Sequence, residues 1–425
     1  MPDELTPQGY RQRVVDDEMA EALAASPAVV VEGPRACGKT WTGRRFARSE
    51  VPFDATSASR LAAQVAPGEL LAGPVPRLLD EWQLAPDIWN AMRRACDDRG
   101  AAGQFILTGS ANPPDDTTRH TGAGRILRVR MRPMSLHESG ESDGSVSLGS
   151  LLASEPCSAT EAALHLPDIV EFVCRGGWPG LLGDRPPVAQ RRLRSYLDEI
   201  SRTDISRVDG VARDPDGVRR LLLSLARNAS TEATLKTLGT DAGINGDRLH
   251  TETVKSYLGA LRRLFVVEEL RCWRPHLRSR AELRSRPKRY FVDPSLAVAA
   301  LRTNRDALMG DLGFFGQLFE SLVLRDLRIY AQSRDWELSY YRDSSGLEVD
   351  VVLTSLDYQQ WAAAEIKLGG EALVLQGAEA LRKLRDKVDT SRMGEPAKLM
   401  VITAGGYGYE FPDGIAVVPI TALSP

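Results

Sequence analysis

Eight consecutive residues near the amino terminus have the types and spacing of a phosphate-binding loop. The string Gly33-Pro34-Arg35-Ala36-Cys37-Gly38-Lys39-Thr40 matches G-x-x-x-x-G-K-[ST] in full, between an apolar run at 28–31 and a helix-like segment at 41–49. The glycines let backbone N–H groups surround phosphates, Lys39 supplies a positive charge, and the Thr40 hydroxyl can ligate Mg²⁺. With Trp41 directly after it, the loop predicts a site for ATP and Mg²⁺. A chance match in a glycine-rich turn is the alternative.

An acidic pair follows the next apolar strand. Leu78-Leu79-Asp80-Glu81 has the form in which Asp80 holds Mg²⁺ and Glu81 orients the attacking water. A capping or surface role for the two acids is the alternative. Further along, the string Thr108-Gly109-Ser110-Ala111-Asn112 can sense the γ-phosphate or simply form a turn. Arg119 and Arg125 are each candidates for a charge-neutralising arginine finger, acting in cis or on a neighbouring copy, or are parts of a solvated basic stretch.

A second group of charged residues lies in the carboxy-terminal quarter of the chain. Glu348 and Asp350 alternate with apolar residues over 347–353, and Glu365 and Lys367 do so over 362–368. If the two strands form a hairpin, Asp350, Glu365 and Lys367 share one face, and Glu320 approaches from a preceding helix. This set resembles the metal-dependent active site of restriction endonucleases, in which Asp350 and Glu365 would hold Mg²⁺ and Lys367 would act on the nucleophile. Ordinary surface charges, or an inactive fold that only binds, are the alternatives.

Eight basic residues crowd the stretch 271–289, with Glu282 as its single acid. The stretch follows a helix–turn–helix–strand pattern, with helices expected at 234–241 and 251–264 and an extended segment at 265–270. This order is typical of a winged helix. The basic stretch, with Lys255, Arg262 and Arg263, predicts contact with nucleic acid. A solvated loop or an acidic protein partner explains the same charges.

The elements that must position these residues are those of an α/β chain. Strands expected at 28–31, 77–79 and 104–107 alternate with helices, beginning with a helix at 12–26, and polar residues 139–150 have the composition of a loop or linker. Later elements include a helix at 378–388 and a strand at 399–403. The chain of 425 residues is therefore expected to contain three domains, at 1–140, 155–300 and 310–425.

Composition narrows the class of protein. Lys and Arg number 54 against 57 Asp and Glu, so the net charge of −3 excludes binding of nucleic acid by bulk positive charge. No run of about 18 apolar residues predicts a membrane span, and the acidic start lacks a signal peptide. Five scattered cysteines form no C-x-x-C pair, which favours reduced thiols and a cytoplasmic location.

The strings GPRACGKT, LLDEWQLAPDIWNAMRR, ILTGSAN and AGRILRVRMRPMSLHE resemble bacterial AAA-type ATPases that carry a carboxy-terminal restriction-endonuclease-like domain of unknown function. The later strings TVKSYLGALRRLFVVEEL, RYFVDPSLA, FFGQLFESLVLRDL, GLEVDVVL and AAEIKLGG extend the resemblance over nearly the whole chain. It implies an AAA-type P-loop domain with a parallel sheet, a helical and winged-helix middle domain, and a restriction-endonuclease-like α/β domain. Ala36 and Cys37 depart from the family, whose loops more often carry larger or branched residues there.

Together these features predict an ATPase whose nucleotide cycle controls a nucleic-acid-directed activity, including Mg²⁺-dependent cleavage. The nucleic-acid partner is expected to be DNA in preference to RNA. The alternative is a switch in which ATP gates assembly with a protein partner and the nuclease-like domain is inactive. Homo-oligomer formation is left open by the sequence.

Overall fold

The structure is a computed structural model that describes residues 5–53, 58–110, 122–157, 160–244, 247–273 and 286–425. These residues form two compact units. Unit 1 contains Met1–Pro133, Asp204–Ala212 and Ala260–Val266, and unit 2 contains Met134–Thr203, Arg213–Gly259 and Val267–Pro425. The three-domain division stays a prediction. In the structure the chain passes from unit 1 to unit 2 at Pro133, and the residues expected to form the middle and carboxy-terminal domains largely share unit 2.

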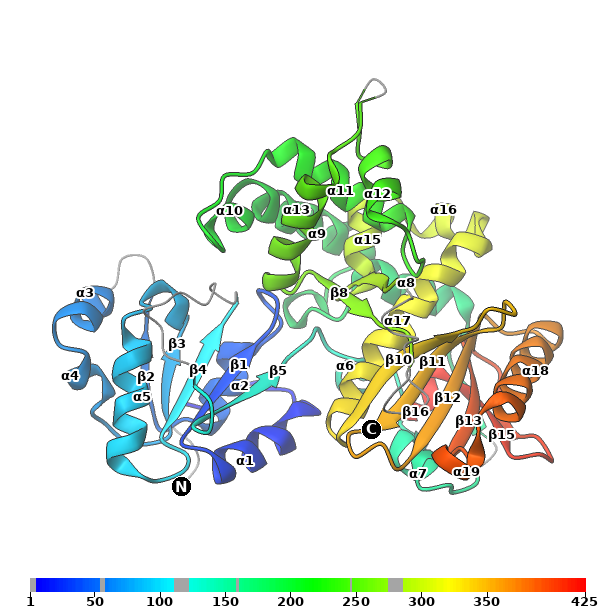
Figure 1. Ribbon diagram of the computed structural model, residues 1–425, viewed down its shortest axis with the longest axis horizontal. Coiled ribbons are helices and arrows are strands. Elements are labelled where there is room, and N and C mark those ends of the chain that lie inside the picture. The colour runs from blue at the N-terminus through cyan, green and yellow to red at the C-terminus, as the bar shows by residue number, and fades with distance from the viewer. Residues whose placement is uncertain (1–4, 54–57, 111–121, 158–159, 245–246, 274–285) are drawn as a thin grey trace. The chain divides into compact units, whose positions relative to one another are not determined.

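Unit 1 is built on a parallel five-stranded sheet in the order β2-β3-β4-β1-β5 (Figure 1). Its strands are β1 (Ala28–Glu32), β2 (Ser49–Pro52), β3 (Arg77–Asp80), β4 (Phe105–Gly109) and β5 (Ile126–Arg130). Residues 28–31 are buried, as expected for a strand covered on both faces. Parallel pairing brings the carboxyl ends of β1, β3 and β4 to the same sheet edge, where the phosphate loop and the acidic pair begin.

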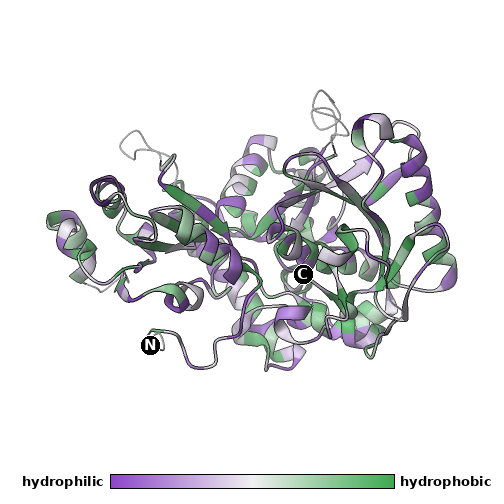
Figure 2. Cartoon of the chain, turned by 90° about the horizontal axis from the view of Figure 1, so that it is seen from below, coloured by the Kyte–Doolittle hydropathy of each residue, from purple (hydrophilic) through white to green (hydrophobic). Residues whose placement is uncertain are grey.

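Helices surround this sheet. They are α1 (Val15–Ala25), α2 (Lys39–Phe46), α3 (Ala58–Val65), α4 (Pro67–Leu71) and α5 (Ile88–Arg99), with a 3-10 turn η1 (Trp82–Leu84). A core under α5 joins Trp82 and Trp89 to apolar residues of β1, β3 and β4. Figure 2 shows strands coloured as hydrophobic and helices with hydrophilic stretches, the pattern of elements that each bury one face. The three expected strands are present, whereas β2 and β5 were not predicted.

Unit 2 contains a mixed seven-stranded sheet in the order β10-β11-β12-β13-β15-β14-β7. The strands are β7 (Thr160–Glu161), β10 (Trp336–Arg342), β11 (Glu348–Ser355), β12 (Trp361–Lys367), β13 (Lys398–Thr403), β14 (Tyr407–Glu410) and β15 (Ile415–Pro419). β11 and β12 form the expected antiparallel hairpin, and β12, β13 and β15 run parallel. Helices α17 (Leu312–Gln332) and α18 (Glu371–Lys387) pack on this sheet, and the short helix α19 (Thr390–Met393) follows α18 (Figure 1).

The middle of the chain is helical. It contains α8 (Leu166–Arg175), η2 (Pro179–Leu181), α9 (Pro186–Glu199), the π-helical segment η3 (Ile200–Asp204), α10 (Ile205–Arg207), α11 (Pro215–Arg227), α12 (Leu235–Asp241), α13 (Thr251–Arg263), α15 (Pro294–Leu301) and α16 (Arg305–Gly310). Strands β8 (Val267–Leu270) and β9 (Lys288–Phe291) pair antiparallel. The expected order of helix, turn, helix and strand is therefore present as α12, α13 and β8. The winged-helix assignment itself stays a prediction.

Residues 139–150, expected to be a loop or linker, contain a loop at 140–145 and regular structure, all within unit 2. The segment contains β6 (Val146–Ser147) and the start of α7 (Leu148–Leu152), and β6 pairs with β16 (Leu423–Ser424), which follows the turn η4 (Ile420–Ala422) near the carboxyl end. The polar serines that made it resemble a linker are engaged within unit 2, as when Ser142 Oγ donates to Leu423 O at 2.7 Å. No helix among the described residues is long and apolar enough to cross a membrane.

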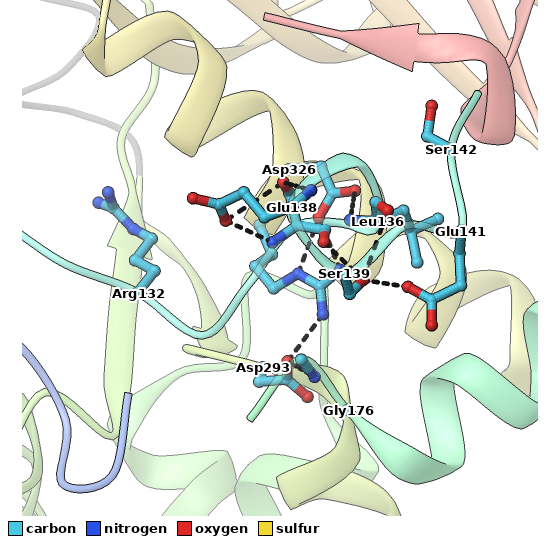
Figure 3. Close-up of polar contacts among 12 residues, drawn as sticks. Arg132, Leu136, Glu138, Ser139, Glu141, Ser142, Gly176, Asp293 and Asp326 are labelled. Carbon is cyan, nitrogen blue, oxygen red and sulfur yellow. Dashed lines mark hydrogen bonds and ion pairs between the residues drawn. The ribbon is translucent and has the colours of Figure 1, made fainter. Parts of the chain in front are cut away.

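The segment after β5 is anchored in unit 2 by a buried polar network (Figure 3). The Leu136 N–H, at the start of α6 (Leu136–Ser139), donates to Asp326 Oδ2 at 2.9 Å. Arg325, which is almost fully buried, pairs with Asp326 at 2.7 Å and with Asp293 at 2.8 Å. Ser135 and Glu138 close a capping box on α6. The string MRPMSLHE therefore contains the point at which the chain enters unit 2, and this network holds its residues in place there.

Candidate functional site

The phosphate loop joins the carboxyl end of β1 to the amino end of α2. Gly38 has φ 109°, in the left-handed region that favours glycine, and it stands directly before the first residue of α2. Gly33 is required for a different reason, since a Cβ there would lie 2.2 Å from Met131 O. Both glycines of the motif thus have a local physical cause. Ala36 also has a positive φ, 61°.

The loop's lysine and threonine are held next to the acid that ends β3. The Thr40 hydroxyl donates to Asp80 Oδ1 at 2.8 Å, and the Thr108 hydroxyl donates to the same oxygen. Lys39 is buried, and its Nζ donates to Pro34 O at 2.7 Å. A hydroxyl beside a carboxylate is a hard oxygen pair of the kind Mg²⁺ prefers, so Thr40 and Asp80 fit the ion expected with ATP.

Glu81 is fixed by its backbone and by two neighbours. It has φ 55°, an unusual left-handed conformation for a glutamate, directly after β3. Gln83 Nε2 donates to Glu81 Oε2, and the Ser110 hydroxyl donates to the same oxygen at 3.3 Å. The side chain expected to orient water is therefore positioned by the turn η1 and by the end of β4. Ala111 and Asn112 lie outside the described residues.

The remaining residues of the loop differ in their surroundings. Arg35 is half exposed and pairs with Asp204 at 2.8 Å within unit 1. Cys37 is fully buried, whereas Trp41 is 45% exposed on α2. Trp41 is thus the loop-flanking aromatic residue whose ring solvent or a ligand can reach.

Arg125 does not lie at the phosphate loop of its own chain. It precedes β5, its carbonyl accepts from the Ala28 N–H at the amino end of β1, and its guanidinium pairs with Asp97 on α5. The loop begins at the opposite end of β1, so Arg125 does not reach it within this chain, and a finger supplied to a neighbouring copy stays a prediction. Arg119 lies outside the described residues.

The second expected constellation forms in unit 2. The register of β11 and β12 pairs Val351 with Ala364, which places Asp350 and Glu365 opposite each other. Lys367 Nζ contacts both, at 3.5 Å from Asp350 Oδ2 and 2.5 Å from Glu365 Oε2. The shared-face hypothesis is therefore met by the geometry. Burial, and then the charge of Asp350, raise the pKa of Glu365 to about 8, against the opposing effect of Lys367.

Two residues that sequence reasoning did not assign to this cluster complete it. Lys288 Nζ lies 2.6 Å from Glu348 Oε1 and 3.6 Å from Glu320 Oε1, and the Tyr290 hydroxyl donates to Glu320 at 2.7 Å. Burial raises the pKa of Glu320 to about 7 although Lys288 opposes this. The pKa of Lys288 is raised because its acidic neighbours outweigh the effect of burial.

Lys288 thus places a protein cation between Glu348 and Glu320, and it interacts electrostatically with Asp350, one of the two acids that were expected to hold a metal. Within the described part of the chain, no group of three or more His, Cys, Asp or Glu side chains is arranged to hold a metal ion. The alternating strand pattern could reveal Asp350 and Glu365. Lys288 carried no such signal, because it stands in a basic stretch that resembles a solvated surface.

Among the described residues, part of the basic stretch 271–289 does not form an exposed positive surface. Lys288 is buried, and Arg289 pairs with Glu269 at 3.3 Å and donates to Ala233 O at 2.9 Å. On α13, Lys255 pairs with Glu252 and Arg263 with Asp209. Four further arginines of the stretch lie outside the described residues: Arg274, Arg278, Arg280 and Arg284.

Comparison with known families agrees with the loop geometry. Residues 25–140 match the model of an AAA domain, residues 166–307 match a domain of unknown function (DUF8612), and residues 315–423 match another (DUF4143). The amino-terminal part of the chain is therefore an AAA-type P-loop ATPase domain, which implies nucleotide binding. Neither carboxy-terminal match is described by an activity.

Curated relatives and solved structures share much of the chain's length. Uncharacterised proteins of Mycobacterium tuberculosis and Mycobacterium bovis are each 24% identical over 410 residues, which is 94% of this chain and 82% of theirs. The Walker-type ATPase PABY2304 of Pyrococcus abyssi is 13% identical, covering 70% of this chain and 99% of its own, with a TM-score of 0.41. The replication initiator DnaA bound to AMPPCP and single-stranded DNA is 12% identical, covering 61% and 93%, with a TM-score of 0.30.

Proposed function

We propose that this protein binds and hydrolyses ATP with Mg²⁺ at the site formed by the phosphate loop, Asp80 and Glu81. The observation that carries the proposal is the 2.8 Å contact between Thr40 Oγ1 and Asp80 Oδ1, next to Lys39 at the start of α2. It joins the loop that follows β1 to the acid that ends β3, so the groups proposed to bind phosphate and those proposed to bind the metal converge at one sheet edge.

The residues have separate roles in this reaction. Lys39 can exchange its contact with Pro34 O for a phosphate oxygen, and Thr40 and Asp80 hold Mg²⁺. The ion, when bound with ATP, neutralises charge on the phosphates. Glu81 accepts a proton from the attacking water, and its hydrogen bonds from Gln83 and Ser110 keep the carboxylate in place.

Substitution of Lys39 tests the proposal. Lys39→Ala should weaken binding of a fluorescent ATP analogue with Mg²⁺ by about 10- to 100-fold, because a hydrogen bond to a charged group contributes roughly 1.5–3 kcal/mol. Lys383→Ala is the matched control, since Lys383 is an exposed lysine on α18 in unit 2. Equal affinities in the Lys39→Ala variant and the control would overturn the nucleotide assignment.

Metal-dependent cleavage of nucleic acid is the second candidate function. The convergence of Asp350, Glu365 and Lys367 favours it, whereas the buried ammonium of Lys288 beside Glu348 opposes it. Single- and double-stranded DNA and RNA should be incubated with Mg²⁺, Mn²⁺ or a chelator. Cleavage that needs the metal and is lost in Lys367→Ala supports a nuclease. No cleavage under any condition supports the alternative, an ATP-gated switch with an inactive nuclease-like domain and a protein partner.

Contact with nucleic acid is a separate proposal that rests on the basic stretch 271–289. Binding should weaken steeply as salt rises, because phosphate contacts release counterions. Charge reversal at Arg278, Arg280 and Arg284 together should weaken it further. Binding that ignores salt, or that survives the triple reversal, would point to a protein partner for these charges.

A further inference from the structure

A short segment before α1 contacts the phosphate loop from outside the matched AAA domain. Arg13 is buried, and its two terminal nitrogens reach two different backbone carbonyls. Nη1 donates to Cys37 O in the loop at 2.9 Å, and Nη2 donates to Arg132 O at 2.8 Å. Because the family match begins at residue 25, no comparison assigns a role to this arginine.

The contact with Cys37 fixes the orientation of one peptide bond in the loop. The peptide bond between Cys37 and Gly38 is trans, so its carbonyl and its N–H point in opposite directions. Arg13 holds the carbonyl, and the Gly38 N–H must therefore point away from Arg13, in the opposite direction within the peptide plane. Phosphate loops bind their ligand through such backbone N–H groups, so a fixed peptide orientation is a binding determinant.

Arg13 is itself held by a buried acid. Asp16 Oδ2 accepts the Arg13 backbone N–H at 3.1 Å, and its Oδ1 accepts the Tyr10 hydroxyl at 2.6 Å. The Tyr10 hydroxyl also lies 3.1 Å from Thr42 Oγ1 on α2. The segment thus contacts both the loop, at Cys37, and the helix that follows it, at Thr42.

The second nitrogen of Arg13 joins the loop to the segment after β5. Met131 O lies so close to Gly33 that no Cβ could fit between them, and Arg132 O accepts from Arg13. Residues 131 and 132 therefore support the start of the loop while Arg13 fixes its middle. Each of these contacts is made within unit 1.

We propose that Tyr10, Arg13 and Asp16 are positioning residues for nucleotide binding, acting by holding the Cys37–Gly38 peptide with its N–H directed toward the phosphates. This rests on the proposed ATP site. The ligand class follows from the contact, because a determinant in the loop backbone acts on phosphate groups and not on the base. Inorganic tripolyphosphate should therefore depend on Arg13 as strongly as ATP does.

The test compares the full chain with Arg13→Ala and Arg13→Lys, and with Arg11→Ala as the matched control at an exposed arginine two residues earlier. Affinities for a fluorescent ATP analogue and for tripolyphosphate are measured with Mg²⁺, and steady-state hydrolysis gives KM and kcat. Arg13→Ala should weaken both ligands by about tenfold or more, since two hydrogen bonds from a charged group are lost. KM should rise by a similar factor, with kcat changed by less than about threefold.

Arg13→Lys distinguishes orientation from charge. A lysine keeps the charge but lacks the planar fork that reaches two carbonyls, so it should recover only part of the affinity. Full recovery would mean that charge alone suffices and would overturn the proposal. Undiminished affinity in Arg13→Ala would overturn it as well.

Two further variants, Tyr10→Phe and Lys39→Ala, complete the test. If Arg13→Ala unfolds, Tyr10→Phe removes only a hydroxyl and should still weaken both ligands by about threefold; wild-type affinity in that variant would then count against the proposal. Lys39→Ala distinguishes failure of the proposed ATP site from failure of the role proposed for Arg13. If Lys39→Ala binds nucleotide as well as wild type does, the proposed ATP site is wrong. If Lys39→Ala loses affinity and the Arg13 variants do not, the ATP site is retained and only the positioning role of Arg13 is overturned.

Discussion

Gly33→Ala is the sharpest structural test of the phosphate loop. The added methyl group would lie 2.2 Å from Met131 O and 3.1 Å from Met131 C, and both atoms belong to backbone. Backbone cannot rotate aside as the end of a flexible side chain can. Either the start of the loop or the segment after β5 must therefore move.

The size of the expected effects on stability and on ATP binding follows from that overlap. A separation of 2.2 Å must grow by roughly 1 Å before it becomes an acceptable contact, and forced insertion of a methyl group costs about 1–3 kcal/mol. A displacement of ~1 Å at a binding site can reduce activity by on the order of 100-fold. We expect Gly33→Ala to lower the stability of unit 1 by about 2 kcal/mol and to weaken ATP binding by at least about tenfold.

Thermal unfolding and nucleotide titration measure the two effects. Gly68→Ala in α4 is the control, because an added Cβ there meets no atom within 4 Å. In a helix, alanine is favoured over glycine by about 1 kcal/mol, so the control should be as stable as wild type or slightly more stable. Wild-type affinity and stability in Gly33→Ala would refute the reasoning, since the segment after β5 would then not constrain the loop.

Three further substitutions test separate features. Glu81→Gln should retain ATP binding and slow hydrolysis by about 100- to 10,000-fold, measured as phosphate release; an unchanged rate would require another base. Asp204→Asn should tighten ATP binding by about two- to fivefold, because an exposed ion pair contributes up to about 1 kcal/mol and its carboxylate competes with phosphate for Arg35. Arg325→Met should destabilise unit 2 by about 3–5 kcal/mol in denaturant unfolding, since two buried carboxylates lose their partner, whereas Arg392→Met at an exposed pair should change little.

The parts of the fold that the sequence predicted are those with short-range causes. The apolar run, the glycines and Lys39 lie within 12 residues of one another, and the two glycines each have a local backbone requirement in the loop. The hairpin of Asp350 and Glu365 follows from strict alternation along two strands. β5 escaped prediction because four of its five residues, all except Val129, are not fully buried, and the two arginines among them made its composition resemble a basic surface.

The residues that the sequence did not reveal act across long separations. Arg13 reaches Cys37 over 24 positions and Arg132 over 119, and no periodicity connects such sites. Lys288 was misinterpreted for a related reason. Its neighbours in sequence are basic, whereas its neighbours in space are acidic, and only the pairing of β8 with β9 and the approach of α17 bring Glu320 to it.

The supports of the phosphate loop differ in strength, and the difference identifies the one that matters most. Asp204 pairs with Arg35 of the loop, but this arginine is 50% exposed. Such pairs contribute about 0–1 kcal/mol each. The hydrogen bonds of Arg13 are made by a buried charged group and contribute roughly 1.5–3 kcal/mol each. We therefore expect the hydrogen bonds of Arg13 to hold the conformation of the loop more strongly than the ion pair of Arg35 with Asp204 does.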